Sequence, residues 1–143
     1  MPRTIRFAQQ LPELWEQGFL VSDEFPLSEQ LVMDYCAVVG DRQWIHDAAR
    51  TEEPVVPGNL LVSLIPRLLQ SMFSVGGAAQ CLTGAYRSIR FRHRVRADDT
   101  VRLSVTAIRV TRRGDREFVD MDISMTCQAR EVMTARVTDV YVD

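Results

Sequence analysis

The sequence predicts one α+β domain spanning residues 1–143, in which a long central helix is wrapped by a curved antiparallel sheet of about five strands. Residues 58–73 are apolar on nearly every side, which is typical of a helix buried in a core. After residue 80 the apolar residues change from helical spacing to alternation, the pattern of half-buried strands. Wrapping the sheet around the helix buries both apolar surfaces.

The composition restricts the class of protein. A chain of 143 residues is long enough to bury a core of its own. The formal net charge is −2, which does not indicate attraction to nucleic acid, and the absence of lysine excludes Schiff-base chemistry on that side chain. No run approaches the ~20 apolar residues of a membrane span, and residues 1–4 lack the apolar core of a signal peptide. We therefore expect a cytoplasmic protein that binds neither membranes nor nucleic acid.

The three cysteines, Cys36, Cys81 and Cys127, are widely spaced, and each lies among apolar residues. An odd number of such residues in a reducing compartment predicts buried free thiols, in preference to a disulfide, a metal site or a nucleophile.

The first half of the chain predicts two helices and one strand. Apolar residues at helical spacing place a short helix over 11–15, and residues 20–25 read as a strand that ends before a proline. Ser28 is a suitable N-cap for the next helix, with Glu29 in its favourable first turn. Gly40 ends that helix.

The second half predicts the central helix and the sheet. Pro66 removes the hydrogen bond to the carbonyl of Val62 and is expected to kink the helix over 58–73. A loop follows at 74–79, and then four antiparallel strands joined by tight turns. The expected strands cover 82–91, 101–107, 119–127 and a last stretch through Val140 and Val142. The expected turns lie at 97–99, 112–115 and 128–131. The outer strands leave open edges, which favours dimerisation by sheet extension.

Asp41 and His46 are the two residues that suggest chemistry. Residues five apart lie roughly 140° apart around a helix and cannot share one face. Because Gly40 ends the preceding helix, the pair is expected on a turn that brings both side chains into one cleft. A carboxylate beside an imidazole, which exchanges protons near neutral pH, suits the activation of water.

The stretch G-D-R-Q-W-I-H followed by P-G-N-L-L-V-S-L-I-P resembles the hydratase motif of the MaoC-like, (R)-specific enoyl-CoA hydratase family, whose members have the hotdog fold. The resemblance extends over nearly the whole chain from about residue 20. It implies that Asp41 and His46 hold and activate the water that adds to, or leaves from, an enoyl thioester. It also implies that the Gly58 N–H contacts the thioester carbonyl and that Ser63 lines the site.

The resemblance further implies a hydro-lyase that interconverts trans-2-enoyl and 3-hydroxyacyl thioesters of coenzyme A or an acyl carrier protein in fatty acid or polyketide metabolism. We expect a homodimer that uses no metal or redox cofactor, since coenzyme A or phosphopantetheine belongs to the substrate. The chain departs from the family at Pro57, where a histidine is usual, and at Asp47, where the usual H-x-D becomes H-D-A. The missing histidine either reshapes the pocket for an unusual substrate or weakens the activity.

Four further residues are candidates for substrate binding, each with a structural alternative. Asn59 is a pocket contact or a polar group at the helix start, and Ser63 contacts substrate or bonds back to its own helix. Trp44 forms the floor of the pocket or packs elsewhere, and Tyr35 lines an acyl tunnel or belongs to the core.

A basic cluster is either a solvated outer face or a site for the phosphates of the carrier. Its members are Arg87, Arg90, Arg92, His93, Arg94 and Arg96.

Two other functions remain compatible with the sequence. A hotdog acyl-CoA thioesterase would share the oxyanion site at the helix start but would place its carboxylate differently. A non-catalytic binding or partner subunit would keep the fold without the activity, and Pro57 makes this alternative reasonable.

Overall fold

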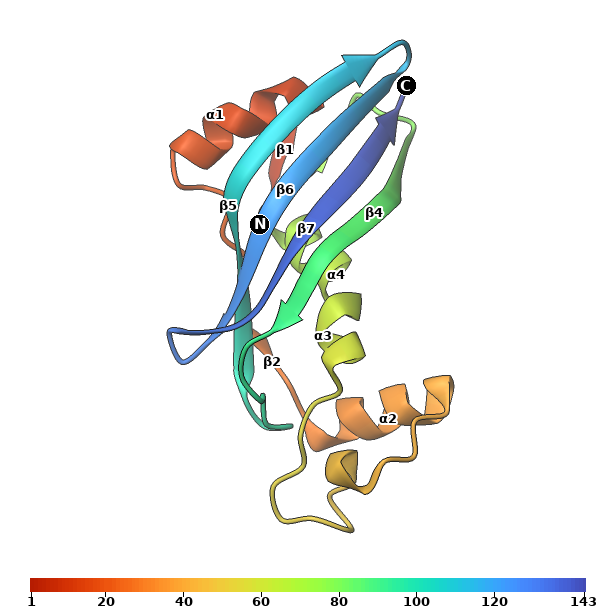
Figure 1. Cartoon of the computed structure of the whole chain (residues 1–143). Coiled ribbons are helices and arrows are strands. Elements are labelled where there is room, and N and C mark those ends of the chain that lie inside the picture. Colours follow the sequence, from red (N-terminus) through yellow and green to blue (C-terminus); the bar gives the residue numbers. More distant parts are fainter.

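A computed structural model describes residues 1–143 and shows a curved five-stranded antiparallel sheet with a helical layer along its concave face (Figure 1). The helices are α1 (Leu11–Glu16), α2 (Glu29–Val39), α3 (Gly58–Ser63) and α4 (Ile65–Met72), with the 3-10 turns η1 (Ala8–Gln10) and η2 (Trp44–His46). The strands of the large sheet are β2 (Phe25–Pro26), β4 (Gln80–Phe91), β5 (Thr100–Arg113), β6 (Arg116–Cys127) and β7 (Arg130–Val142). A separate small sheet pairs β1 (Arg3–Ile5) with β3 (Phe73–Val75).

The alternation predicted for the second half is confirmed, but one connection differs from the prediction. The strand order is β2-β5-β6-β7-β4, so β4 pairs with the last strand of the chain instead of with β5. Residues 92–99 therefore cross from one edge of the sheet to the other. The turn predicted at 97–99 is present, with the Asp99 N–H donating to the Arg96 carbonyl at 3.1 Å, but it does not join two neighbouring strands. Local alternation identifies strands but carries no information about which distant strand is the partner.

The two hairpins that follow are tight. β5 and β6 are joined at Gly114, which has a φ of +63°, as a two-residue hairpin requires. Gln128 and Ala129 turn the chain between β6 and β7, with φ values of +53° and +62°. These turns fix the register that points Val119, Met121 and Ile123 into the core.

The central helix is broken in two, as Pro66 predicts. Leu64 ends α3 and begins α4, and Pro66 lies in the first turn of α4, where its missing N–H is tolerated. The buried residues of the two helices that belong to the core include Leu60, Leu61, Ile65, Leu68 and Leu69. The helix is less uniformly apolar than expected, because α4 exposes Arg67 and Gln70 to solvent.

The caps predicted for α2 are confirmed. The Oγ of Ser28 accepts a hydrogen bond from the N–H of Leu31 at 3.0 Å, and Gly40 ends the helix with a φ of +74°. α2 projects from the body of the domain (Figure 1) and buries only Val32 fully.

Three predictions were wrong in detail. The strand over 20–25 is reduced to β2 and an isolated bridge between Val21 and Ser104. The loop over 74–79 begins with β3, which pairs in parallel with β1 and was missed because its partner lies at the other end of the chain. Of the cysteines, all free, Cys127 is buried as expected, whereas Cys36 is half-buried and Cys81 is exposed.

None of the helices has the length and apolar character needed to span a membrane.

Candidate active site

The turn after α2 positions Asp41. The left-handed conformation of Gly40 reverses the chain, and the N–H of Asp41 donates to the carbonyl of Cys36 at 3.0 Å. The Asp41 side chain closes the turn on the other side, since its Oδ1 accepts the N–H of Gln43 at 3.1 Å. Its second oxygen, Oδ2, remains free and lies 3.5 Å from Nε2 of His46.

His46 is buried and is held by a single backbone contact. Its Nδ1 lies 2.5 Å from the carbonyl oxygen of Val55, an acceptor that only an N–H can satisfy. Nδ1 therefore carries the proton, and in the neutral imidazole Nε2 is an acceptor that faces Asp41. Each member of the pair thus has one atom committed to the backbone and one directed at its neighbour.

Asp41 and His46 line a cleft of about 510 Å³ together with Gly58 and Asn59 at the start of α3. The N-cap of this helix is Pro57, which has no side chain that accepts a hydrogen bond. The first N–H groups of a helix lack intrahelical partners, so those of α3 are left unclaimed by the cap. The cleft accordingly contains a carboxylate, an imidazole and backbone donors.

Gly58 allows the close approach of an aromatic ring. A Cβ at this position would lie 2.8 Å from Cζ of Phe91, far inside van der Waals contact. Phe91 ends β4 and also lines the cleft, so the first residue of α3 and the end of β4 are packed directly against each other. The glycine at the helix start therefore allows the cleft to form against the sheet.

Three predicted substrate-binding residues lie elsewhere. Ser63 Oγ donates to the carbonyl oxygen of Asn59 at 2.7 Å, within its own helix, and is not part of the cleft lining. Trp44 is 59% exposed, and Tyr35 is half-buried against the core. Neither of these two aromatic residues lines the cleft.

The basic cluster divides into two groups. Arg92, His93 and Arg94 line the cleft beside Gly58, and all three are exposed. The Arg92 guanidinium, however, donates to Thr134 Oγ1 at 3.3 Å and lies 4.0 Å from Glu131. Arg96 forms an ion pair with Glu53 outside the lining of the cleft, and Arg87 and Arg90 lie on the outer face of the sheet.

Two parts of the cleft could not be predicted from the sequence. The carbonyl of Val55 belongs to the backbone, and its contact with His46 depends on the path of the connecting loop. The contact of Phe91 with Gly58 joins the end of β4 to the start of α3, two segments that are distant in the sequence.

No family model and no curated protein matches the sequence. Solved structures do match, among them a monoamine oxidase regulatory protein from Archaeoglobus with a TM-score of 0.68 and 16% identity, covering 87% of this chain and 88% of that one. An (R)-hydratase from A. caviae involved in PHA biosynthesis matches with a TM-score of 0.61 and 23% identity, covering 83% of this chain and 94% of that one. A 3R-hydroxyacyl-ACP dehydratase complex from Mycobacterium tuberculosis matches with a TM-score of 0.64 and 18% identity, covering 84% and 93%.

The chain has the hotdog fold. The expected similarity to hotdog hydratases and dehydratases is thereby confirmed for the arrangement of the helix and sheet. At these sequence identities the similarity establishes the fold alone, and any activity must be inferred from the residues of the cleft.

Proposed function

We propose that this hotdog protein is a hydro-lyase that interconverts trans-2-enoyl and 3-hydroxyacyl thioesters. The observation that carries the proposal is the pairing of Asp41 Oδ2 with His46 Nε2 at 3.5 Å in a cleft that also contains the start of α3. The hotdog (R)-hydratase and 3R-hydroxyacyl-ACP dehydratase add support through their fold.

The geometry supports a mechanism in which Asp41 and His46 share one water. Asp41 Oδ2 and His46 Nε2 each accept one of its protons, which directs its oxygen lone pair at the β-carbon of the enoyl thioester. As the oxygen attacks, one proton moves to Nε2 and the π electrons move to the thioester oxygen. The Gly58 N–H donates to the enolate that forms. The same proton then passes from Nε2 to the α-carbon, and the carbonyl is restored; elimination is the reverse.

The two residues have separate roles in this mechanism. His46 transfers the proton, and the bond from Nδ1 to the Val55 carbonyl holds the ring in the tautomer that leaves Nε2 free to accept it. Asp41 orients the water and stabilises the imidazolium that forms during the transfer. No metal or redox cofactor enters the reaction, and coenzyme A or phosphopantetheine is part of the substrate.

The decisive experiment measures hydration of trans-2-enoyl-CoA substrates of increasing chain length by the loss of enoyl absorbance. We expect His46→Ala and Asp41→Asn each to lower turnover by at least about 100-fold while the melting temperature changes little. His93→Ala, at the exposed histidine in the same cleft, and Asp34→Asn, on the exposed face of α2, are matched controls that we expect to retain activity. Turnover like that of the unmodified protein in His46→Ala would exclude the proposed mechanism.

The same assay distinguishes the alternative functions. A thioesterase releases a free thiol from the acyl-CoA, whereas a hydratase consumes the enoyl absorbance with no thiol released. A binding or partner subunit retains the thioester unchanged, an alternative that Pro57 and the regulatory protein of the same fold both favour. Binding without turnover across the whole series would support that alternative.

The exposed arginines of the cleft favour a substrate with a phosphorylated carrier. Arg94 lies beside Gly58, where the carrier end of a thioester would leave the cleft if its carbonyl contacts the Gly58 N–H. Arg92 also lines the cleft, but its guanidinium is engaged by Thr134 and Glu131. Guanidinium groups bind phosphate oxygens through paired N–H donors. We therefore propose coenzyme A or an acyl carrier protein as the carrier and a second copy of this chain as the partner, with neither nucleic acid nor a membrane involved.

A further inference from the structure

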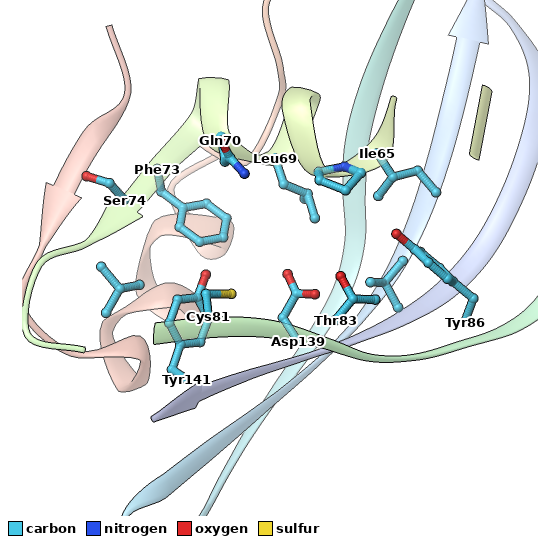
Figure 2. Close-up of a pocket in the computed structure, with 13 residues that line it drawn as sticks. Ile65, Leu69, Gln70, Phe73, Ser74, Cys81, Thr83, Tyr86, Asp139 and Tyr141 are labelled. Atoms are coloured by element: carbon cyan, nitrogen blue, oxygen red, sulfur yellow. The ribbon is translucent and has the colours of Figure 1, made fainter. Parts of the chain in front are cut away.

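A second cavity, of about 560 Å³, lies between α4 and the concave face of the sheet, beside the edge strand β4 (Figure 2). It shares no lining residue with the cleft that holds Asp41 and His46. One wall is apolar and comes from Ile65, Leu69 and Phe73, on α4 and the first residue of β3. Its volume falls in the range of about 300–1,000 Å³ that is usual for small-molecule sites.

The opposite wall is polar because of the strand register. Cys81 pairs with Tyr141 and Thr83 pairs with Asp139 across β4 and β7, so the four side chains form one patch on the inner face of the sheet. Figure 2 shows the Asp139 carboxylate directed into the cavity between Cys81 and Thr83 and facing α4. The cavity therefore has an apolar side and a polar side that carries an acid.

The Asp139 carboxylate has no hydrogen-bond or ion-pair partner within the chain. The residue is only 9% exposed, yet it forms neither a hydrogen bond nor an ion pair, and no arginine or histidine lines the cavity. Burial raises the pKa of Asp139 to about 6, as expected for a carboxylate that is partly desolvated and has no positive charge beside it. A carboxylate in this state is stabilised by a ligand that brings a positively charged donor into the cavity.

We propose that this cavity binds a small amphipathic cation, with an ammonium group on the Asp139 carboxylate and an apolar body against α4. The hydroxyls of Thr83 and Tyr141 flank the carboxylate and can accept the remaining protons of the ammonium group. An anionic ligand would be repelled by Asp139, and a purely apolar one would leave the carboxylate unpaired. This site is independent of the proposed hydration of thioesters.

Calorimetry at pH 7.5 with n-hexylamine, hexan-1-ol and hexanoate tests the proposal, because the three probes share a chain and differ in the head group. We expect hexylamine to bind at least about tenfold more tightly than hexanol, and hexanoate not to bind. Asp139→Asn is expected to weaken hexylamine binding at least tenfold, to the level of hexanol. Asp122→Asn, on the outer face of β6 where the carboxylate holds Arg136, is the matched control and should leave binding unchanged.

A pH series on the unmodified protein provides a second test that does not depend on the folding of a variant. The other ionisable groups lining the cavity are Cys81 and Tyr86 on β4 and Tyr141 on β7, and burial raises the pKa of each. On β6, the acidic residue whose side chain lies on the inner face of the sheet is Glu117, which pairs with Tyr141 and lies 3.8 Å from a guanidinium nitrogen of Arg112. The residues of α4 that line the cavity are all neutral.

As the pH rises from 5 to 8, hexylamine remains charged while Asp139 loses its proton. We therefore expect the affinity of the protein for hexylamine to increase about tenfold. No binding of hexylamine, equal binding by Asp139→Asn, or affinity independent of pH would each overturn the proposal.

Discussion

His46 and Asp41 each use one side-chain atom to bond to the backbone and direct a second atom at each other. Nδ1 of His46 is bound to the Val55 carbonyl, and Oδ1 of Asp41 accepts the N–H of Gln43. In the proposed hydration, neither side chain would need to reorganise before Nε2 and Oδ2 act on a shared water, and such preorganisation lowers the cost of reaching a charged transition state. The turn after Gly40 brings together an acid and an imidazole that are five residues apart in the sequence.

The unpaired carboxylate of Asp139 predicts a stability effect that depends on pH. The folded-state pKa of about 6 lies above the ordinary value of 3.8, so the folded protein holds this proton while the unfolded chain releases it. Stability from this group is greatest at low pH and is lost as the pH rises through the window between the two values.

We expect the free energy of unfolding of Asp139→Asn, relative to that of the unmodified protein, to increase by about 2 kcal/mol as the pH rises from 4.5 to 7. Urea denaturation of both proteins at several pH values measures the difference. A difference that stays constant across this range would show that Asp139 is not desolvated in the folded state.

The helices and strands show which parts of the structure are encoded locally. Ser28 and Gly40 determine the ends of α2 through their own side chain and backbone, and Pro66 breaks the central helix where it occurs in the chain. The parallel pairing of β1 with β3 and the crossing from β4 to β5 were not predictable, because both depend on contacts between distant segments. The cleft was predictable as a motif, whereas the burial of Asp139 required the register of β4 against β7.

At the start of α3, we expect the substitution Gly58→Ala to lower activity with little effect on the stability of the fold. Gly58→Ala places a methyl group against the ring of Phe91, which is 51% exposed and can move away. We expect unfolding free energy to change by no more than about 1 kcal/mol, since alanine is also the better helix former.

Hydration of enoyl-CoA is expected to fall at least about tenfold in Gly58→Ala, because the methyl group narrows the approach of the thioester to the backbone N–H. The control is the double variant Gly58→Ala with Phe91→Ala, which removes the clash. If the double variant regains activity, the loss in Gly58→Ala came from displacement of the Phe91 ring and not from a narrower approach to the backbone N–H.

The segment after β4 predicts a change in substrate affinity without a change in chemistry. Arg94→Ala removes a cationic group that lines the cleft, so we expect KM for an acyl-CoA to rise several-fold with kcat unchanged. Arg92→Ala is expected to have a smaller effect, because the Arg92 guanidinium is held by Thr134 and Glu131. Arg87→Ala, on the outer face of the sheet, is the matched control. Steady-state kinetics at two salt concentrations provide the measurement; a loss confined to kcat would place these arginines in the chemistry.

At the scale of the whole molecule, the two edges of the sheet are unequal. β2 covers one edge with two residues, whereas β4 leaves twelve residues of backbone without a neighbour on its outer side. Leu82 and Phe91 on this strand are 52% and 51% exposed. A long strand with exposed apolar residues at the edge of a sheet pairs readily with another chain, and a second copy carries the identical edge.

We therefore expect the protein to form a homodimer in which two β4 strands pair in an antiparallel arrangement to extend the sheet. Sedimentation equilibrium of the unmodified protein should give twice the chain mass of 16.3 kDa. Leu82→Glu places like charges near each other across the new strand pair and should raise the dissociation constant at least about tenfold. Thr106→Glu adds the same charge to β5, away from the β4 edge, and should leave the dimer intact. A monomer at micromolar concentration, or equal weakening by both substitutions, would contradict pairing through β4 and place the contact on another surface.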